Sequence, residues 1–335
     1  MTARSILTKV LLGAVLLLAV GAAPASADPA GPSDFRSVVT GIVPEAAGLS
    51  AAIRGGDTYL EIHVAPGHEV TVLDYSQPGD PYVRVLKDGT VERNRHSAAT
   101  YINNNRQGKG TIPPEAHPGA TPLWEKVGTG GHYAWHDHRV HWMGDVTPPV
   151  PRGQLVTGAY APWHVPMIVD GKLVQVEGTL LYEKAMSPLP WVAAGLGAAG
   201  LLAWLGRKHA VRSAAATLLV VGISATVVGR ADFSSNPGGG NPLMWMLPAV
   251  GLIAAAVALL RSDKGTGVVG ILASVATLSS WALLRYKVLL KPVLPTHFAL
   301  GLDRTTVAVA FGVAVASAYL AVTSGGLRLP ELEDD

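Results

Sequence analysis

The sequence predicts an all-β sandwich domain outside the cytoplasm, followed by an α-helical bundle that crosses the membrane. Three observations predict this class. Residues 1–27 have the features of a secretory signal, residues 28–187 alternate between apolar and polar positions in short runs, and residues 188–324 hold five long apolar runs without charges. Only 15% of the 335 residues are charged and 49% are hydrophobic. This composition is more apolar than that of most soluble globular proteins.

The first 27 residues contain the three parts of a signal peptide. Two basic residues precede an apolar core from Val10 to Ala22, and Ala25-Ser26-Ala27 is a small-residue cleavage pattern before Asp28. The alternative is that this segment stays attached as an N-terminal anchor. In both cases we expect the chain from Asp28 onward on the outer side of the membrane.

Residues 28–187 have the pattern of short strands. The run Thr58–Val64 alternates, with every second side chain apolar, as expected for a strand with one buried face. The pairs Asp88-Gly89 and Asp170-Gly171 each predict a tight turn between two strands. Residues 93–119 are polar and rich in Asn, Gly and Pro, which predicts a long loop. About 160 residues with this pattern predict an Ig-like β-sandwich.

Residues 188–324 predict five transmembrane helices. Each apolar run has 17 to 20 residues, which is enough to cross the hydrocarbon core at about 1.5 Å per residue. Gly and Ala recur in several of them and allow helices to approach closely in lipid. The five runs are Leu189–Gly206, Ser213–Gly229, Leu243–Leu260, Gly265–Leu284 and Thr305–Thr323.

The signal fixes the expected orientation, because a translocated first domain makes the first span run inward. The basic residues of 207–212 and 261–264 then face the cytoplasm, in agreement with the positive-inside rule. The basic connection 285–304 conflicts with that rule, since it would lie outside. We expect a multi-pass protein of the plasma membrane, with the acidic tail 325–335 in the cytoplasm.

Several functions are excluded or disfavoured by composition. The chain has no cysteine, which excludes disulfides, iron–sulfur clusters, thiolate zinc sites and blue-copper centres. A net charge of +2 gives no basic excess for nucleic acid. No Asp, Glu or His lies within a predicted span, so a proton relay or a haem held by two helical histidines is not expected. The helices therefore resemble an anchor or assembly surface more than a transporter.

The outer domain holds nine of the eleven histidines, and four of these fall between His132 and His141. Side chains two residues apart on a strand point to the same face, so His136 and His138 are expected side by side, with His132 on the same face. On a regular strand His141 and Met143 would lie on the opposite face, so a bulge or turn is needed to bring them to the same face as His136 and His138. The candidate metal ligands are His136, His138, His132, His141, Met143 and His164.

The donor types favour copper, with zinc second. Imidazole suits Cu(II) and Zn(II), and a thioether suits Cu(I). Gly131, Trp135, His136 and His138, followed five residues later by Met143, resemble the copper-binding strand of cupredoxin-type domains. Multicopper oxidases and the copper-binding subunit of membrane methane monooxygenases carry similar strands.

The resemblance implies a cupredoxin-like fold and a role for His136 and His138 in binding copper. The chain departs from the family in two respects. It lacks the cysteine ligand of blue-copper sites, so electron transfer through such a site is not expected. The expected mature terminus, Asp28, also supplies no imidazole.

Three hypotheses for function follow. The first is extracytoplasmic binding of copper, or zinc, for metal homeostasis or delivery. The second is a non-catalytic membrane component whose sandwich docks another membrane protein, an envelope protein or an envelope polymer. Under this hypothesis Asp137 and Arg139 pair with each other, and the histidines have a structural role. The third, an enzyme that uses a histidine-bound metal as a Lewis acid, ranks last. The expected partners are the lipid bilayer and such a protein, and not nucleic acid.

Overall fold

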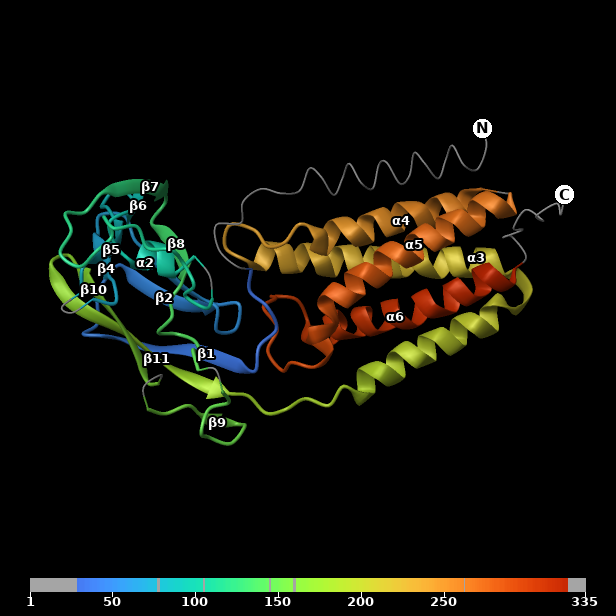
Figure 1. Ribbon diagram of the computed structural model, residues 1–335, viewed down its shortest axis with the longest axis horizontal. Helices are drawn as coiled ribbons and strands as arrows, with labels where there is room; N and C mark the ends of the chain where they lie inside the picture. Colours follow the sequence, from blue (N-terminus) through green and yellow to red (C-terminus); the bar gives the residue numbers. More distant parts are fainter. Residues whose placement is uncertain are drawn as a thin grey trace.

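The fold is described here from a computed structural model that covers residues 29–324 except 77–78, 105, 145, 159–160 and 262. The predicted signal and the acidic tail lie outside these described residues. Figure 1 shows a strand-rich part and a bundle of long helices that follow one another along the long axis of the molecule. All the strands precede residue 183, and the long helices begin at Leu189.

The strands form two antiparallel sheets. The larger sheet has the order β1-β11-β10-β4-β5-β6-β7, with β9 paired to β11, and the smaller sheet has the order β2-β3-β8. The strands are β1 (Phe35–Val43), β2 (Leu49–Arg54), β3 (Tyr59–Val64), β4 (Val70–Leu73), β5 (Pro81–Val85), β6 (Val91–Asn94), β7 (Trp124–Gly128), β8 (His132–His136), β9 (Gln154–Leu155), β10 (Trp163–Val169) and β11 (Lys172–Tyr182).

Several elements predicted from the sequence are confirmed. The alternating run is strand β3, and its apolar side chains Leu60, Ile62 and Val64 are buried. Asp88-Gly89 lies in the turn between β5 and β6, and Asp170-Gly171 lies between β10 and β11. Both residues of the second pair have positive φ, which is what a two-residue hairpin turn requires.

One hydrophobic core contains side chains from both sheets. Ile62 and Trp135 come from the smaller sheet, and Val83, Val165 and Met167 come from the larger one. All five are at most 4% exposed. Removal of this apolar surface from water holds the two sheets together. The long loop 95–123 between β6 and β7 contains the short helix α2 (Ala99–Ile102) and leads past the end of β8.

The helical part contains four helices, within the described residues, that are long and apolar enough to cross a membrane. This finding indicates a multi-pass membrane protein. The helices are α3 (Leu189–Ser235), α4 (Leu243–Leu260), α5 (Lys264–Arg285), which continues into the 3-10 turn η1 (Tyr286–Leu289), and α6 (Leu300–Thr323).

The first two predicted spans are joined in α3, so the structure has four candidate helices where the sequence predicted five separate spans. At 47 residues α3 would be about 70 Å long if it were straight, more than twice the hydrocarbon core. It is not straight, because His209 has non-helical torsion angles (φ −138°, ψ 59°). The chain reverses there, and the two arms of α3 lie within the same bundle (Figure 1).

Glycines allow the helices to pack closely, as the sequence predicted. A Cβ atom on Gly195 would lie 2.6 Å from the carbonyl oxygen of Ala308 in α6. One on Gly229 would lie 1.7 Å from the carbonyl oxygen of Met244 in α4. No real side chain tolerates these distances, so α3 depends on glycine to contact both neighbours.

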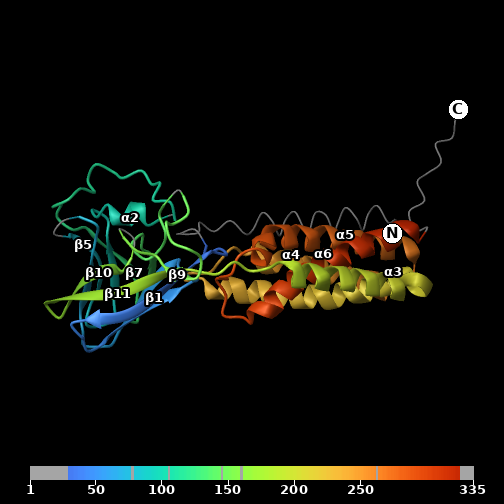
Figure 2. The ribbon, with the colours of Figure 1, turned by 90° about the horizontal axis from the view of Figure 1, so that it is seen from below.

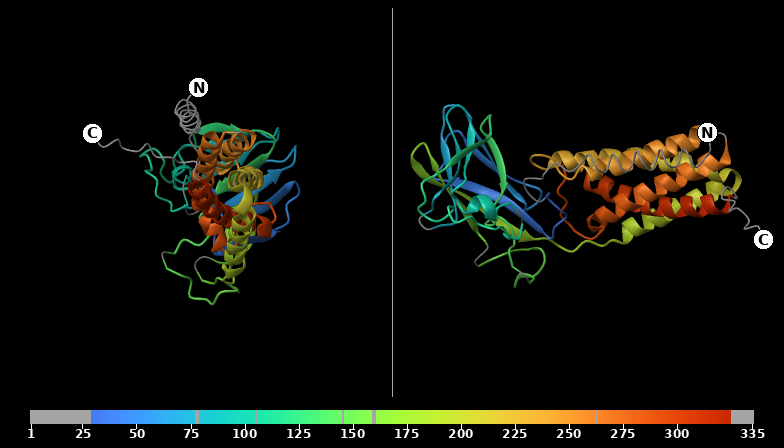
Figure 3. Two further views of the ribbon diagram at one scale, coloured as in Figure 1. Left: turned by 90° about the vertical axis from the view of Figure 1, so that its right-hand side faces the viewer. Right: turned by 45° about the horizontal axis from the view of Figure 1, so that its top comes forward.

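The two parts of the chain are tied together at one end of the bundle. Ser33 and Val293 exchange two backbone hydrogen bonds of 3.0 and 3.1 Å, and the backbone N–H of Ala30 donates to the side chain of Asn236 at 2.8 Å. Asp34, just before β1, forms an ion pair with Lys291. The strand-rich part therefore sits at the end of the bundle where α3 ends and α4 begins (Figures 2 and 3).

Candidate metal centre

Strand β8 ends at His136, and the chain then turns. The prediction that His136 and His138 lie on one continuous strand is therefore wrong. The turn has a physical cause in Asp137, whose side chain accepts a hydrogen bond from the backbone N–H of Arg139 at 3.0 Å, while its carbonyl accepts from Val140 at 3.1 Å. Aspartate favours such turns because its carboxylate reaches the backbone two residues further on.

The carboxylate of Asp137 is fully buried and is satisfied from several sides. It accepts two hydrogen bonds from the Arg139 guanidinium, at 2.8 and 2.7 Å, and one from the Trp135 indole at 2.9 Å. Burial opposes ionisation, but the Arg139 charge and these hydrogen bonds outweigh it and hold the pKa of Asp137 below its usual value. The second hypothesis expected an Asp137–Arg139 pair. The pair exists, but it is buried.

A second chain segment fixes the turn. The Tyr75 hydroxyl accepts from the backbone N–H of His138 at 3.0 Å and donates to Asn103 at 2.6 Å. The guanidinium of Arg139 lies 4.7 Å from the centre of the Tyr75 ring. Gly108, in the long loop, lies so close to His138 that a Cβ atom there would be 2.7 Å from Cε1 of the imidazole. The position of His138 is thus set by three separate segments.

The turn brings four of the six predicted ligands together: His136, His138, His141 and Met143. The ring centres of His138 and His141 are 5.2 Å apart, and those of His136 and His141 are 6.5 Å apart. Nε2 of His141 lies 2.8 Å from the sulfur of Met143. We call these four residues the His–Met cluster. The sequence required a bulge or turn to bring His141 and Met143 round, and the Asp137 turn does so.

The imidazole of His141 is fully buried, and its Nδ1 has no hydrogen-bond partner among the described residues. Burial, with the charge of Arg106 as the next cause, lowers the pKa of His141 to about 3. The ring is therefore neutral at physiological pH, and a neutral imidazole carries the lone pair that a metal ligand needs. His138 and Met143 are only half-buried and form the accessible side of the cluster.

One ring separation in the His–Met cluster, the 5.2 Å between His138 and His141, falls in the range of a metal site, and the 6.5 Å between His136 and His141 exceeds it. Two imidazoles on one ion, with metal–nitrogen bonds of about 2 Å, have ring centres roughly 5 to 6 Å apart. Among the described residues, however, no group of three His, Asp or Glu side chains is already arranged around a common point. The cluster thus has suitable donors, of which His138 and His141 are suitably spaced, and its side chains would have to move to share one ion.

The other two predicted ligands lie elsewhere. His132 is at the start of β8, exposed, with Nε2 2.7 Å from a carboxylate oxygen of Glu61. His164 is exposed on β10, in the larger sheet, with Nδ1 3.6 Å from a carboxylate oxygen of Glu177. The structure does not bring either residue to the His–Met cluster. Each imidazole faces a carboxylate on the sheet surface, an ordinary arrangement for an exposed histidine.

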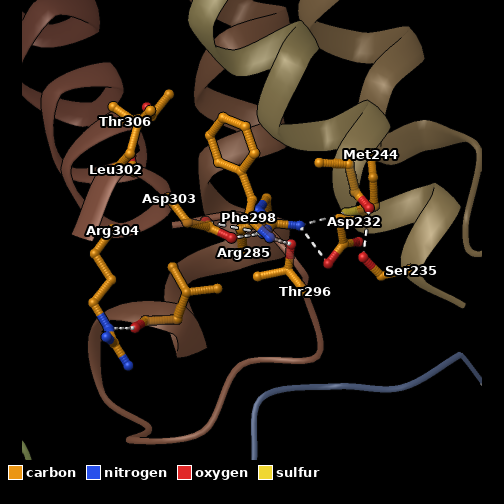
Figure 4. Close-up of polar contacts among 12 residues, drawn as sticks. Asp232, Ser235, Met244, Arg285, Thr296, Phe298, Leu302, Asp303, Arg304 and Thr306 are labelled. Carbon is orange, nitrogen blue, oxygen red and sulfur yellow. Dashed lines mark hydrogen bonds and ion pairs between the residues drawn. The ribbon is translucent and has the colours of Figure 1, made fainter. Parts of the chain in front are cut away.

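A buried ionic cluster lies at the end of the helical bundle that contacts the strands (Figure 4). Arg285 in α5 forms ion pairs of 3.1 Å with Asp232 in α3 and 2.7 Å with Asp303 in α6. All three residues are at most 8% exposed. The sequence missed these carboxylates because both aspartates lie just outside the predicted apolar runs, in helical turns that extend them. The ion pairs join three helices.

Basic residues at this end of the bundle have local polar partners. Arg304 donates to the backbone carbonyls of Val288 and Pro292 at 3.0 and 2.9 Å, and Lys291 pairs with Asp34. The connection 285–304 holds four basic residues, and the side chains of all except Lys287 thus have a polar partner among the described residues. On the predicted orientation, these partners account for basic residues at an end where the positive-inside rule does not expect them.

Comparison with known proteins gives no further assignment. No protein-family model, curated protein or solved structure matches this chain.

Proposed function

We propose that this protein binds copper, with zinc as second choice, on the outer side of the plasma membrane, for metal homeostasis or delivery without electron transfer. The ligands are drawn from the His–Met cluster. One observation carries the proposal: the turn after β8 gathers three imidazoles and a thioether within one small region. Imidazole and thioether donors together suit copper in either oxidation state better than they suit zinc.

The electrostatics of the cluster support a cation as its ligand. His141 is buried and neutral, and its Nδ1 lacks a partner among the described residues. Leaving a buried nitrogen without a hydrogen bond costs about 1–3 kcal/mol, and a metal ion at Nδ1 would recover that cost. Because Nε2 is the nitrogen that faces Met143, an ion shared by Nδ1 and the thioether requires the His141 ring to flip. His138 and Met143, the half-buried members, would be the ligands that an ion from solvent meets first.

The surrounding fold supports the same proposal. Two antiparallel sheets share one hydrophobic core, which is compatible with the β-sandwich that a cupredoxin-like domain requires. The predicted signal would place this domain outside, and the helices would hold it at the membrane surface. Copper is then the cargo of a tethered carrier.

The experiment is a metal titration of the full-length protein in mild detergent. After chelator treatment, the protein is titrated with Cu(I), Cu(II) and Zn(II) against competing chelators. We expect one copper ion per chain, bound more tightly than zinc. The variant His138→Ala/His141→Ala should lose this ion, whereas the control His132→Ala/His164→Ala, which also removes two imidazoles, should keep it.

Equal copper content in these two double variants would contradict the proposal. Zinc bound in preference to copper would reverse the order of the metals. Circular dichroism of each variant distinguishes lost ligands from a lost fold.

A second candidate function rests on a different observation. A pocket of about 550 Å³ opens beside β8 and is lined by Tyr133, Arg93, Asn103 and the Pro237–Gly238 segment, among others. Aromatic, guanidinium and amide groups together suit a polar polymer such as an envelope glycan. Cosedimentation of the full-length protein with insoluble peptidoglycan tests this candidate, and the variant Tyr133→Ala should reduce binding. Equal sedimentation of both proteins would contradict it.

A further inference from the structure

A second large pocket lies at the opposite end of the bundle from the strands. It has a volume of about 800 Å³, and its lining comes from both arms of α3 at the break, from the start of α5 and from the end of α6. The connection between the two arms of α3 marks this end in Figure 1, far from the sheets. We call it the far-end pocket. On the predicted orientation it faces the cytoplasm.

Four basic side chains line the far-end pocket: Arg207, Lys208, Arg212 and Lys264. None of the four has an ion-pair or side-chain hydrogen-bond partner among the described residues. The opposite end of the bundle differs, since Arg285 and Lys291 there are paired with aspartates. Four unpaired cations around one cavity repel one another, and an anion in the cavity would relieve that repulsion.

The backbone adds to this positive potential. Because His209 is not helical, the second arm of α3 begins at the pocket wall, and its first N–H groups lack partners within that arm. The N-terminal end of a helix carries a partial positive charge that attracts phosphate and other anions. Here it coincides with the four cationic side chains.

The pocket also has an apolar side that faces the lipid. Trp204 and Tyr319 line it and are 60% and 63% exposed, which is typical of aromatic residues at the membrane interface. Gly200 lies one helical turn deeper, and a Cβ atom there would meet nothing within 4 Å. The open space beside Gly200 continues from the basic region toward the hydrocarbon layer. A ligand that fits both sides carries a negative head and an apolar chain.

We propose that the far-end pocket binds an anionic phospholipid, with its phosphate among the four basic side chains and one acyl chain beside Gly200. Basic pockets between membrane helices on the cytoplasmic side are suited to anionic headgroups. The proposal does not depend on copper binding. The acidic tail of the same chain, beyond Ser324, and free phosphate are the competing occupants, and the test distinguishes them.

The test is native mass spectrometry of the full-length protein in mild detergent, with phosphatidylglycerol or phosphatidylcholine of equal chain length. We expect one phosphatidylglycerol to be retained at least about tenfold more strongly than phosphatidylcholine, given the attraction of each basic residue for an anionic headgroup. The variant Arg207→Gln/Arg212→Gln should lose this preference. The control Arg230→Gln/Lys287→Gln removes the same charge at the opposite end of the bundle and should keep it.

A second pair of variants tests the acyl-chain position without changing charge. Gly200→Leu fills the open side of the pocket and should reduce retention of phosphatidylglycerol severalfold. Gly197→Leu is the matched control, because a Cβ atom there also meets nothing within 4 Å and Gly197 is not part of the pocket lining. Equal retention in both variants would overturn the assigned acyl position.

Three further outcomes would overturn the proposal. Equal retention of the two lipids by the unmodified protein shows that the pocket does not select anionic lipid. Displacement of phosphatidylglycerol by millimolar inorganic phosphate identifies a site for the free ion. A preference that appears only after deletion of residues 325–335 identifies the acidic tail as the natural occupant.

Discussion

The buried imidazole of His141 makes the stability of the outer domain depend on pH. Its pKa is about 3 in the folded protein, compared with an ordinary value of 6.5. Between these values the unfolded chain binds a proton that the folded chain does not, so stability is present above pH 6.5 and is lost as pH falls. The slope is about 1.4 kcal/mol per pH unit for one residue.

Between pH 7 and pH 4.5, the titration of His141 should lower the free energy of unfolding by about 2–3 kcal/mol. This value is the integral of that slope over the interval. The assay is hydrogen exchange of the full-length, metal-free protein, followed by mass spectrometry of peptides from β3 and β8. After correction for the intrinsic exchange rate, protection should fall by about two orders of magnitude from this residue.

The comparison with His141→Gln isolates the contribution of the imidazole, because other titrating groups act in both proteins. The free energy of opening, calculated from the protection factors, should change with pH less steeply in the variant, by about 1.4 kcal/mol per pH unit. The control His164→Gln changes an exposed imidazole and should keep the full slope. Parallel pH profiles for the unmodified protein and His141→Gln would refute the assignment of a buried neutral ring.

Two further predictions concern the cluster and the bundle. Gly108→Ala places a methyl group 2.7 Å from His138 and should weaken copper binding at least about tenfold. The control Gly119→Ala is also at positive φ but has open space around it, so it should leave copper affinity unchanged. Equal copper affinities of the two variants in the chelator titration would contradict the prediction. Asp303→Asn removes the charge-assisted hydrogen bonds of one carboxylate to Arg285 but leaves its pair with Asp232, and should cost about 2 kcal/mol, seen as a lower thermal midpoint in detergent. An unchanged midpoint would show that the pair does not stabilise the bundle.

Much of the outer fold could be predicted from local pattern. The alternation in β3 and the two Asp-Gly turns depend on neighbouring residues alone, so the sequence is sufficient to place them. The His–Met cluster could be predicted only in part. Side chains two residues apart share a face only as long as the strand continues, and nothing in the spacing of His136 and His138 marks the end of the strand. Asp137 was the available signal, since aspartate favours turns.

The contacts that fix the cluster could not be predicted from the sequence. Tyr75 and Gly108 lie 63 and 30 residues before His138, in segments whose relation to β8 depends on the packing of the two sheets. The Asp232–Arg285–Asp303 ion pairs were missed for a related reason. Charge-free windows mark where helices cross the lipid core, but helices continue beyond them, and charges can be buried there when they are paired.

The central claim is that the turn after β8 supplies imidazole and thioether ligands to one copper ion. X-ray absorption spectroscopy of the copper-loaded, full-length protein tests it most directly. We predict imidazole nitrogens at about 2 Å together with one sulfur scatterer, and loss of the sulfur in Met143→Leu. A Met143→Leu spectrum identical to that of the unmodified protein, or an unmodified protein that retains no copper, would contradict the account.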